Sequence, residues 1–152
     1  MTERPDAGFS LVEVTLALGV AAFCLVGVFG LLPIGLKTQQ TAIEETAATR
    51  TLSAVISDLR STPRTATTSS LFGITISSNS AASSSTLYFD TEGRMSPAID
   101  ASSRYRLTIT FRPNATGGRS ATFAHLLVAW PARATAPKAS GTAETFVALD
   151  RN

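Results

Sequence analysis

The sequence predicts an α+β protein in which one long N-terminal helix packs on a small antiparallel sheet of about four strands. Three patterns in the 152 residues lead to this prediction. An apolar run without charge comes first, a helical amphipathic pattern follows it, and short alternating segments typical of strands fill the rest. The mean hydropathy is positive, at +0.19, because the apolar residues are concentrated near the start. One domain with an appended segment fits this length.

The apolar run is long enough to cross a membrane. Between Glu13 and Lys37 lie 23 residues without a charge, and a bilayer core of about 30 Å needs roughly 20 helical residues. We therefore predict a transmembrane helix over residues 9–36. A cleavable secretory signal fits poorly, because the run is too long and its small-residue site lies in front of it. An ordinary anchor leaves Glu13 unexplained, since an acid inside the bilayer costs about 2.5–3.5 kcal/mol.

A second helical segment is predicted over residues 37–60, continuous with the first. Its apolar residues recur every three or four positions, whereas most of its charged residues, Asp58 among them, are predicted to lie on the other faces. The apolar stripe consists of Ala48, Leu52, Val55, Ile56 and Leu59. The helix is expected to stop before Pro63, because the residue preceding a proline disfavours the helical conformation. In the apolar run that precedes this segment, Pro33 and the glycines near it predict a kink or local melting of the helix.

Residues 61–152 are predicted to form the sheet. The segment "RYRLTITFR" alternates apolar and polar residues, and "TLYFD" leads into the turn "DTEG", where Gly93 suits a positive φ. The segment "TFAHLLVAW" is apolar on both faces, which predicts an inner strand ended by Pro131. "TFVALD" is expected to be a short last strand. The polar segment "SSNSAASSST" is expected to be an exposed loop.

Few residues carry the chemistry that catalysis or metal binding requires. One cysteine, Cys24, and one histidine, His125, cannot build a zinc site of the usual type, and no nucleophile motif is present. We therefore expect no enzyme and no cofactor, a packing role for Cys24 and a structural, partly buried role for His125. Three carboxylates near turns are weak calcium candidates, but they lack EF-hand spacing, so ordinary turn hydrogen bonding is favoured. They are Asp90, Glu92 and Asp100.

The charge of the rear domain is mildly positive. Residues 61–152 hold nine basic and five acidic side chains, a net charge of +4. The arginines are scattered among predicted strands and turns, whereas a nucleic-acid interface gathers them on one face. The pattern therefore does not favour nucleic-acid binding.

The segment "GFSLVE", from Gly8 to Glu13, resembles the processing signal of type IV prepilins and pseudopilins, in which a short leader ends in Gly and a Glu follows at the fifth mature position. The resemblance implies a leader over residues 1–8, cleavage between Gly8 and Phe9 by a prepilin peptidase, and N-methylation of Phe9. The leader departs from the usual pattern because its only base is Arg4. The segments "LLPIGL", "WP" and "FVALDRN" further resemble the pilin-like proteins of the Verru_Chthon cassette.

By this resemblance we expect a structural subunit, a minor pilin or pseudopilin, of a type IV pilus or a type II secretion-like filament. It would cross the inner membrane once, with its N-terminus in the cytoplasm and residues 61–152 outside it. Its partners would be other pilin subunits and the prepilin peptidase and methyltransferase. Glu13 would pair with the amine of Phe9 on a neighbouring subunit. The residues expected to pack subunits together are Leu16, Gly19, Ala22, Leu32 and Pro33.

One alternative remains open from the sequence. The chain could be a single-pass, membrane-tethered module that binds DNA or a surface polymer and never polymerises. In that case Glu13 would be dispensable, whereas a filament subunit would need it.

Overall fold

The computed structural model describes residues 8, 10–76, 82–112 and 122–150. The chain divides into two compact units, Met1–Thr41 and Ala42–Asn152. The α-helix α1 (Leu11–Ser61) contributes residues to both units. The sheet belongs entirely to the second unit, which we call the sheet unit. The predicted α+β class, with a long N-terminal helix and an antiparallel sheet, is confirmed.

Helix α1 begins directly after Ser10, whose carbonyl accepts the first helical hydrogen bond from the Val14 amide at 3.2 Å. It ends at Ser61, just before Thr62 and Pro63, so the predicted stop is confirmed. Pro33 lies inside the helix without interrupting it. Of the predicted kink or local melting, the melting is therefore wrong, and the kink stays a prediction. A proline removes only its own amide donor, and the neighbouring turns keep their hydrogen bonds and hold the helix together.

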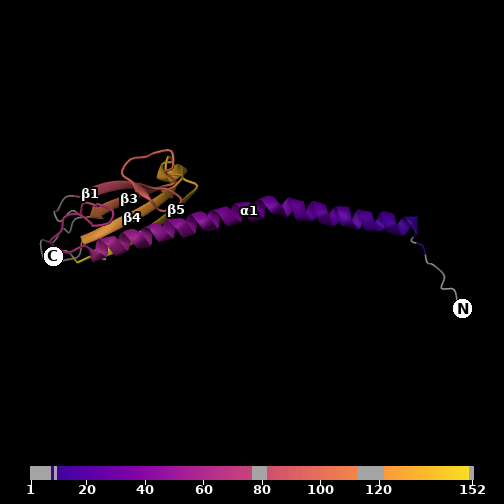
Figure 1. Ribbon diagram of the computed structural model, residues 1–152, viewed down its shortest axis with the longest axis horizontal. Helices are drawn as coiled ribbons and strands as arrows, with labels where there is room; N and C mark the ends of the chain where they lie inside the picture. Colours follow the sequence, from indigo (N-terminus) through magenta and orange to yellow (C-terminus); the bar gives the residue numbers. More distant parts are fainter. Residues whose placement is uncertain (1–7, 9, 77–81, 113–121, 151–152) are drawn as a thin grey trace. The chain divides into compact units, whose positions relative to one another are not determined.

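The sheet has five antiparallel strands in the order β2-β1-β3-β4-β5, one more than expected. The additional strand is the two-residue β2, which pairs with the end of β1 after a tight turn. Figure 1 shows β1, β3, β4 and β5 beside the rear segment of α1. The strands are β1 (Ser83–Phe89), β2 (Met95–Ser96), β3 (Tyr105–Arg112), β4 (Thr122–Trp130) and β5 (Gly141–Leu149), with a short 3-10 helix, η1 (Ala136–Lys138), before β5.

Most strand predictions are confirmed, and two are corrected. The side chains of β3 alternate between buried and partly exposed, and β4 is an inner strand that ends at Trp130. β5 is longer than predicted because all nine of its residues pair with β4. The predicted serine-rich loop is wrong for Ser83–Thr86, which pair with β3; residues 77–81 of that prediction lie outside the described residues. A partner strand offers hydrogen bonds to a backbone whose side chains alone do not favour a strand.

The core of the sheet unit lies between the sheet and the predicted apolar stripe of α1. Ala48, Val55 and Leu59 are almost fully buried, and Leu52 is 6% exposed, so the stripe is confirmed. Ile56 packs at its margin. A sheet of this size has a small core, and these helix side chains complete it. They meet a layer of buried sheet side chains that includes Leu107, Ile109, Phe111, Leu126, Val128 and Val147.

Candidate functional site

The front of α1 is an apolar surface with nothing packed on it in its own unit. Every described residue from Leu11 to Leu36 is exposed, including large side chains such as Phe23, at 81%, and Leu31, at 67%. The helix is long and apolar enough to cross a membrane, and none of its most apolar window is buried. A helix from the core of a soluble protein would instead be mostly buried. We call residues 11–36 the apolar segment.

Glu13 is the one carboxylate of the apolar segment and lies in the first turn of α1. Negative charge at a helix N-terminus is favoured by the backbone dipole. Ser10 and Glu13 also have the Ser-x-x-Glu spacing of a capping box, in which both side chains satisfy free backbone amides. Glu13 is exposed, so its carboxylate is available to a partner from outside the chain. A local capping role and an intermolecular pairing role therefore compete for this residue.

The predicted cleavage site is only partly described. Gly8 is exposed and lies outside the helix, and no atom lies within 4 Å of the position that a Cβ would occupy there. Phe9, which would supply the new amine, lies outside the described residues. Because α1 begins only at Leu11, Gly8 is not held in helical conformation.

The five residues predicted to pack subunits together all lie on the exposed apolar segment, but not on one line. At 100° per residue, Leu16 and Ala22 lie about 60° to either side of Gly19, whereas Leu32 lies about 140° away. Pro33 lies on the same side of the helix as Gly19. Contact with a single neighbouring helix could cover only part of this set. Cys24 is exposed on the same segment.

The carboxylates at the end of β1 form ordinary turn contacts. Asp90 accepts hydrogen bonds from the Glu92 amide at 2.9 Å and from the Arg94 amide at 2.8 Å, and it forms an ion pair with the Arg94 guanidinium. Partial desolvation opposes ionisation of Asp90, but the bonds from Arg94 outweigh it and lower its pKa. Gly93 takes the predicted positive φ, at 82°. The predicted turn chemistry is therefore confirmed.

Asp100 makes a separate turn of its own. Its carboxylate accepts bonds from the hydroxyls and the amides of Ser102 and Ser103, which lower its pKa. Its hydrogen-bond partners are different from those of Asp90. Among the described residues, no three His, Cys, Asp or Glu side chains gather where they could hold a metal ion.

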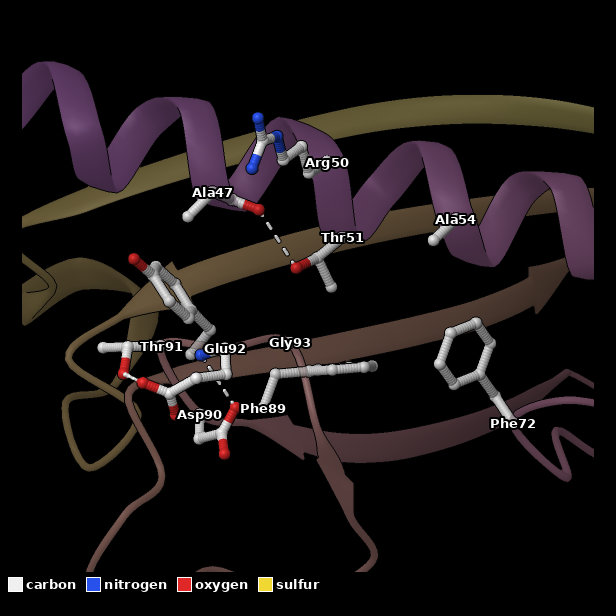
Figure 2. Close-up of a pocket in the computed structure, with 11 residues that line it drawn as sticks. Ala47, Arg50, Thr51, Ala54, Phe72, Phe89, Asp90, Thr91, Glu92 and Gly93 are labelled. Atoms are coloured by element: carbon white, nitrogen blue, oxygen red, sulfur yellow. Dashed lines mark hydrogen bonds between the residues drawn. The ribbon is translucent and has the colours of Figure 1, made fainter.

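A hollow of about 190 Å³ lies between the rear segment of α1 and the turn after β1. Figure 2 shows Asp90, Thr91 and Glu92 gathered at one side of this hollow, with Phe72 at the other side and α1 above. Phe72 and Phe89 meet edge to face, with ring centroids 5.6 Å apart. The lining thus combines aromatic side chains with charged groups of both signs, the carboxylates of Asp90 and Glu92 and the guanidinium of Arg50. The remaining residues that line the hollow are Ala47, Thr51, Ala54, Gly93 and Tyr105.

His125 lies on the face of β4 that points away from α1. Its ring stacks on Phe146 of β5 at 4.5 Å between centroids, and its Nε2 lies 3.0 Å from a carboxylate oxygen of Glu144. The side chain is partly buried, at 23% exposure, as predicted. Phe123 is exposed nearby on the same face, since it lies two residues before His125 on β4. This face is therefore not uniformly apolar, and it carries aromatic and charged groups together.

Asp58 is the residue that sequence patterning misplaced. It was predicted to lie off the apolar stripe, but it is 5% exposed. Its two carboxylate oxygens accept hydrogen bonds from the Leu71 and Phe72 amides, at 3.0 and 3.1 Å, and from the Ser70 hydroxyl. Asp58 thereby ties the loop after α1 to the helix. The sequence carried only a weak signal of this burial. It consists of a single acid next to the apolar stripe, followed by a Ser-rich loop whose backbone amides can donate to a carboxylate.

Comparison of the chain with protein-family models, with curated proteins and with solved structures finds no match.

Proposed function

We propose that this chain is a structural subunit of a type IV pilus or of a type II secretion-like filament, a minor pilin or pseudopilin, assembled through its apolar segment. The observation that carries the proposal is the combination of "GFSLVE" with a lone carboxylate in the first turn of a long, uncharged and exposed helix. The resemblance of this segment to prepilin processing sites is what supports the proposed pilin or pseudopilin family. The exposed apolar surface of residues 11–36 gives a physical reason for assembly, because it needs a membrane or other helices to cover it.

The apolar segment cannot remain in water, because exposed apolar surface costs about 25 cal/mol per Å². A bilayer can cover the apolar segment, but Glu13 then also enters the bilayer, at a cost of about 2.5–3.5 kcal/mol. Cleavage after Gly8 would create a cationic amine on Phe9, and N-methylation would leave that amine cationic. A carboxylate and an amine from two neighbouring chains then satisfy each other, so that only a correctly staggered neighbour removes the penalty.

On this proposal the chain is made in the inner membrane, with its N-terminus in the cytoplasm and the sheet unit on the other side. A prepilin peptidase removes residues 1–8, and a methyltransferase modifies Phe9. The mature chain then joins other pilin subunits in a filament.

The intact mass of the protein, extracted from the membranes of cells that make it, tests the processing step. We expect a chain that begins at Phe9 and carries one added methyl group. A chain that still begins at Met1 in cells with an active prepilin peptidase would contradict the proposal.

Two substitutions at Glu13 separate pairing from capping. Glu13→Gln keeps the capping-box spacing, because Gln also serves at that position, but it removes the charge. If the carboxylate pairs with an amine, both Glu13→Gln and Glu13→Leu should insert in the membrane and yet fail to enter filaments. Glu45→Gln is the matched control, because Glu45 is an exposed acid on α1 in the sheet unit. Normal assembly of Glu13→Gln would assign the residue to capping and remove the basis of the pairing mechanism.

A second candidate is a membrane-tethered binding module that does not polymerise. It is favoured by the exposed aromatic side chains of Phe123 and Phe146 on the face of the sheet away from α1, together with the net +4 of residues 61–152. Exposed aromatic patches of this kind often mark interaction sites. This candidate predicts that Glu13→Leu leaves binding intact, and that Phe123→Ser with Phe146→Ser abolishes it.

A further inference from the structure

The face of the sheet that points away from α1 gathers side chains that lie far apart in the sequence. Successive residues of a strand point to opposite faces, and in each of β1, β3, β4 and β5 the more buried alternate set packs on the α1 side. The other set lies on the far side, which we call the outer face, and the strand registers place its members side by side. The aromatic and basic side chains that the structure describes there are Tyr88, Arg106, Arg112, Phe123, His125 and Phe146.

Each arginine of the outer face lies next to an aromatic residue. Arg112 is directly opposite Phe123 in the register of β3 with β4. Arg106 is directly opposite Tyr88 in the register of β1 with β3. Neither guanidinium forms an ion pair with a residue that the structure describes. Their positions on β3 are about 20 Å apart, so the two positive charges stand at opposite ends of the outer face.

Most of the aromatic rings lie at the β4 and β5 side of this face. The His125 imidazole stacks on the Phe146 ring, with centroids 4.5 Å apart and an angle of 18° between the planes. Phe146 is still 67% exposed, and Phe123, which precedes His125 by two positions on β4, is 52% exposed. Thr108 and Thr110 on the neighbouring β3 are partly exposed and add hydroxyl groups. The outer face thus offers uncovered rings beside hydrogen-bonding groups.

The charge of the outer face is modest. Among the residues that the structure describes, Glu144 is its only acid, and a carboxylate oxygen of Glu144 lies 3.0 Å from Nε2 of His125. Two guanidinium groups against one carboxylate leave a net charge of +1. This charge favours an anionic ligand, but exposed charges are screened by salt and hold a ligand only weakly. The exposed phenylalanine rings therefore have to supply most of the affinity for any ligand.

We propose that the outer face binds a single strand of nucleic acid. Bases of the strand stack on Phe123 and Phe146, and phosphates on either side of them contact Arg106 and Arg112. Exposed aromatic rings on which bases stack, combined with basic side chains along the path of the backbone, hold single strands with little regard to their sequence.

The same groups do not suit a duplex. The bases of a duplex stack on one another, and only their edges reach the grooves. An unpaired strand can instead turn its bases onto the rings of a sheet. An anionic polysaccharide would meet the same two arginines, but it has no flat aromatic base to place on either phenylalanine. The arginines are scattered along the sequence, and only the strand registers bring two of them onto one face with the rings.

This inference names a ligand class for the face on which the second candidate function also rests. It is equally compatible with a filament, because assembly is proposed through the apolar segment and not through the sheet. A failed binding experiment would leave the tests of processing and of Glu13 unaffected. The failure of this inference and the failure of the filament proposal can therefore be told apart.

Fluorescence anisotropy of a labelled oligothymidylate tests binding to the full-length chain in non-ionic detergent micelles. A length of about 16 nucleotides is the upper end of what one small domain covers. Oligouridylate of the same length is the RNA arm, and we expect both probes to bind, because stacking does not depend on the sugar. Annealing the oligothymidylate to oligoadenylate should weaken binding at least about tenfold, because the bases are then no longer free to stack on the rings.

Substitutions of the rings test the stacking. Phe123→Ser and Phe146→Ser should each weaken binding at least about fivefold, the lower end of what one base stacked on a ring contributes. Leu71→Ser is the matched control, because Leu71 is 68% exposed but lies in the loop whose amides bond to Asp58 of α1. All three side chains are exposed, so urea unfolding should show near wild-type stability in every variant.

Substitutions of the arginines test the phosphate contacts. Arg106→Gln and Arg112→Gln should each lower the slope of log affinity against log salt concentration by about 0.7, because each removes one phosphate contact. Arg50→Gln is the matched control, since it removes an exposed arginine of α1, on the other side of the sheet. It should leave the slope unchanged.

Three results would overturn the inference. The first is a full-length chain that binds neither oligonucleotide at low salt. The second is heparin, a polyanion without bases, binding as tightly as oligothymidylate with no loss in the two phenylalanine variants, which would assign the face to charge alone. The third is absent oligonucleotide binding together with self-association in micelles that Phe123→Ser with Phe146→Ser abolishes, which would make the outer face a contact between copies.

Discussion

Replacing Asp58 tests whether a buried carboxylate holds the loop after α1 in place. Asp58→Ala leaves the amides of Leu71 and Phe72 and the hydroxyl of Ser70 without their acceptor. Each buried donor left unsatisfied costs about 1–3 kcal/mol. Ser70 and Leu71 are exposed, so water can partly replace their bonds. We therefore expect the free energy of unfolding of the sheet unit to fall by about 2–3 kcal/mol, or by roughly 8–13 °C in melting temperature.

The assay is urea unfolding of the full-length chain in detergent micelles, followed by the fluorescence of Trp130. This is the chain's only tryptophan and is 4% exposed. Asp58→Asn keeps one carbonyl acceptor and should cost about half as much as Asp58→Ala. Asp100→Ala is the matched control: it removes an aspartate that accepts four hydrogen bonds, all of them exposed, and it should cost less than about 1 kcal/mol. Equal costs for Asp58→Ala and Asp100→Ala would refute the argument from burial.

The same residue makes a prediction about pH. Burial alone would raise the pKa of Asp58, but the hydrogen bonds from Ser69, Leu71, Phe72 and Ser70 outweigh it and lower the pKa below its ordinary value. A carboxyl with a lower pKa in the folded state stabilises the fold at pH values above its unfolded pKa of about 3.9. That contribution is lost as the pH falls through the folded pKa. Asp58→Asn should therefore flatten the acid limb of the stability profile, and an unchanged acid limb would count against the assignment.

Two further predictions concern the end of the sheet at which β1 and β4 end. Gly141→Ala should destabilise the sheet unit by about 1–3 kcal/mol, because a Cβ there would lie 2.2 Å from the Trp130 indole; urea unfolding measures this, and wild-type stability would contradict the packing. Burial, and then the Glu44 carboxylate, raise the pKa of Tyr105, so its contribution to stability is complete below its unfolded value of about 10 and is lost as the pH rises above that value. Tyr105→Phe should remove this alkaline loss of stability, which unfolding midpoints between about pH 9 and 11 would detect.

Periodicity predicted those parts of this protein in which one pattern persists over many residues. The uncharged run up to Leu36 predicted a helix that leaves its apolar side chains uncovered. The stripe through Ala48 and Leu59 predicted the face that the sheet covers, and the alternation in β3 predicted its buried side. Burial of apolar side chains dominates the energy of these segments, and that preference can be read residue by residue along the chain.

The tertiary structure alone decided the contacts that depend on partners distant in sequence. Asp58 could be buried only because a loop more than ten residues later brings free amides to it. Ser83–Thr86 became a strand only because β3 offered a ladder of hydrogen bonds. Polar groups gain stability from particular partners and not from burial as such, so their positions follow from the assembled fold rather than from the local sequence.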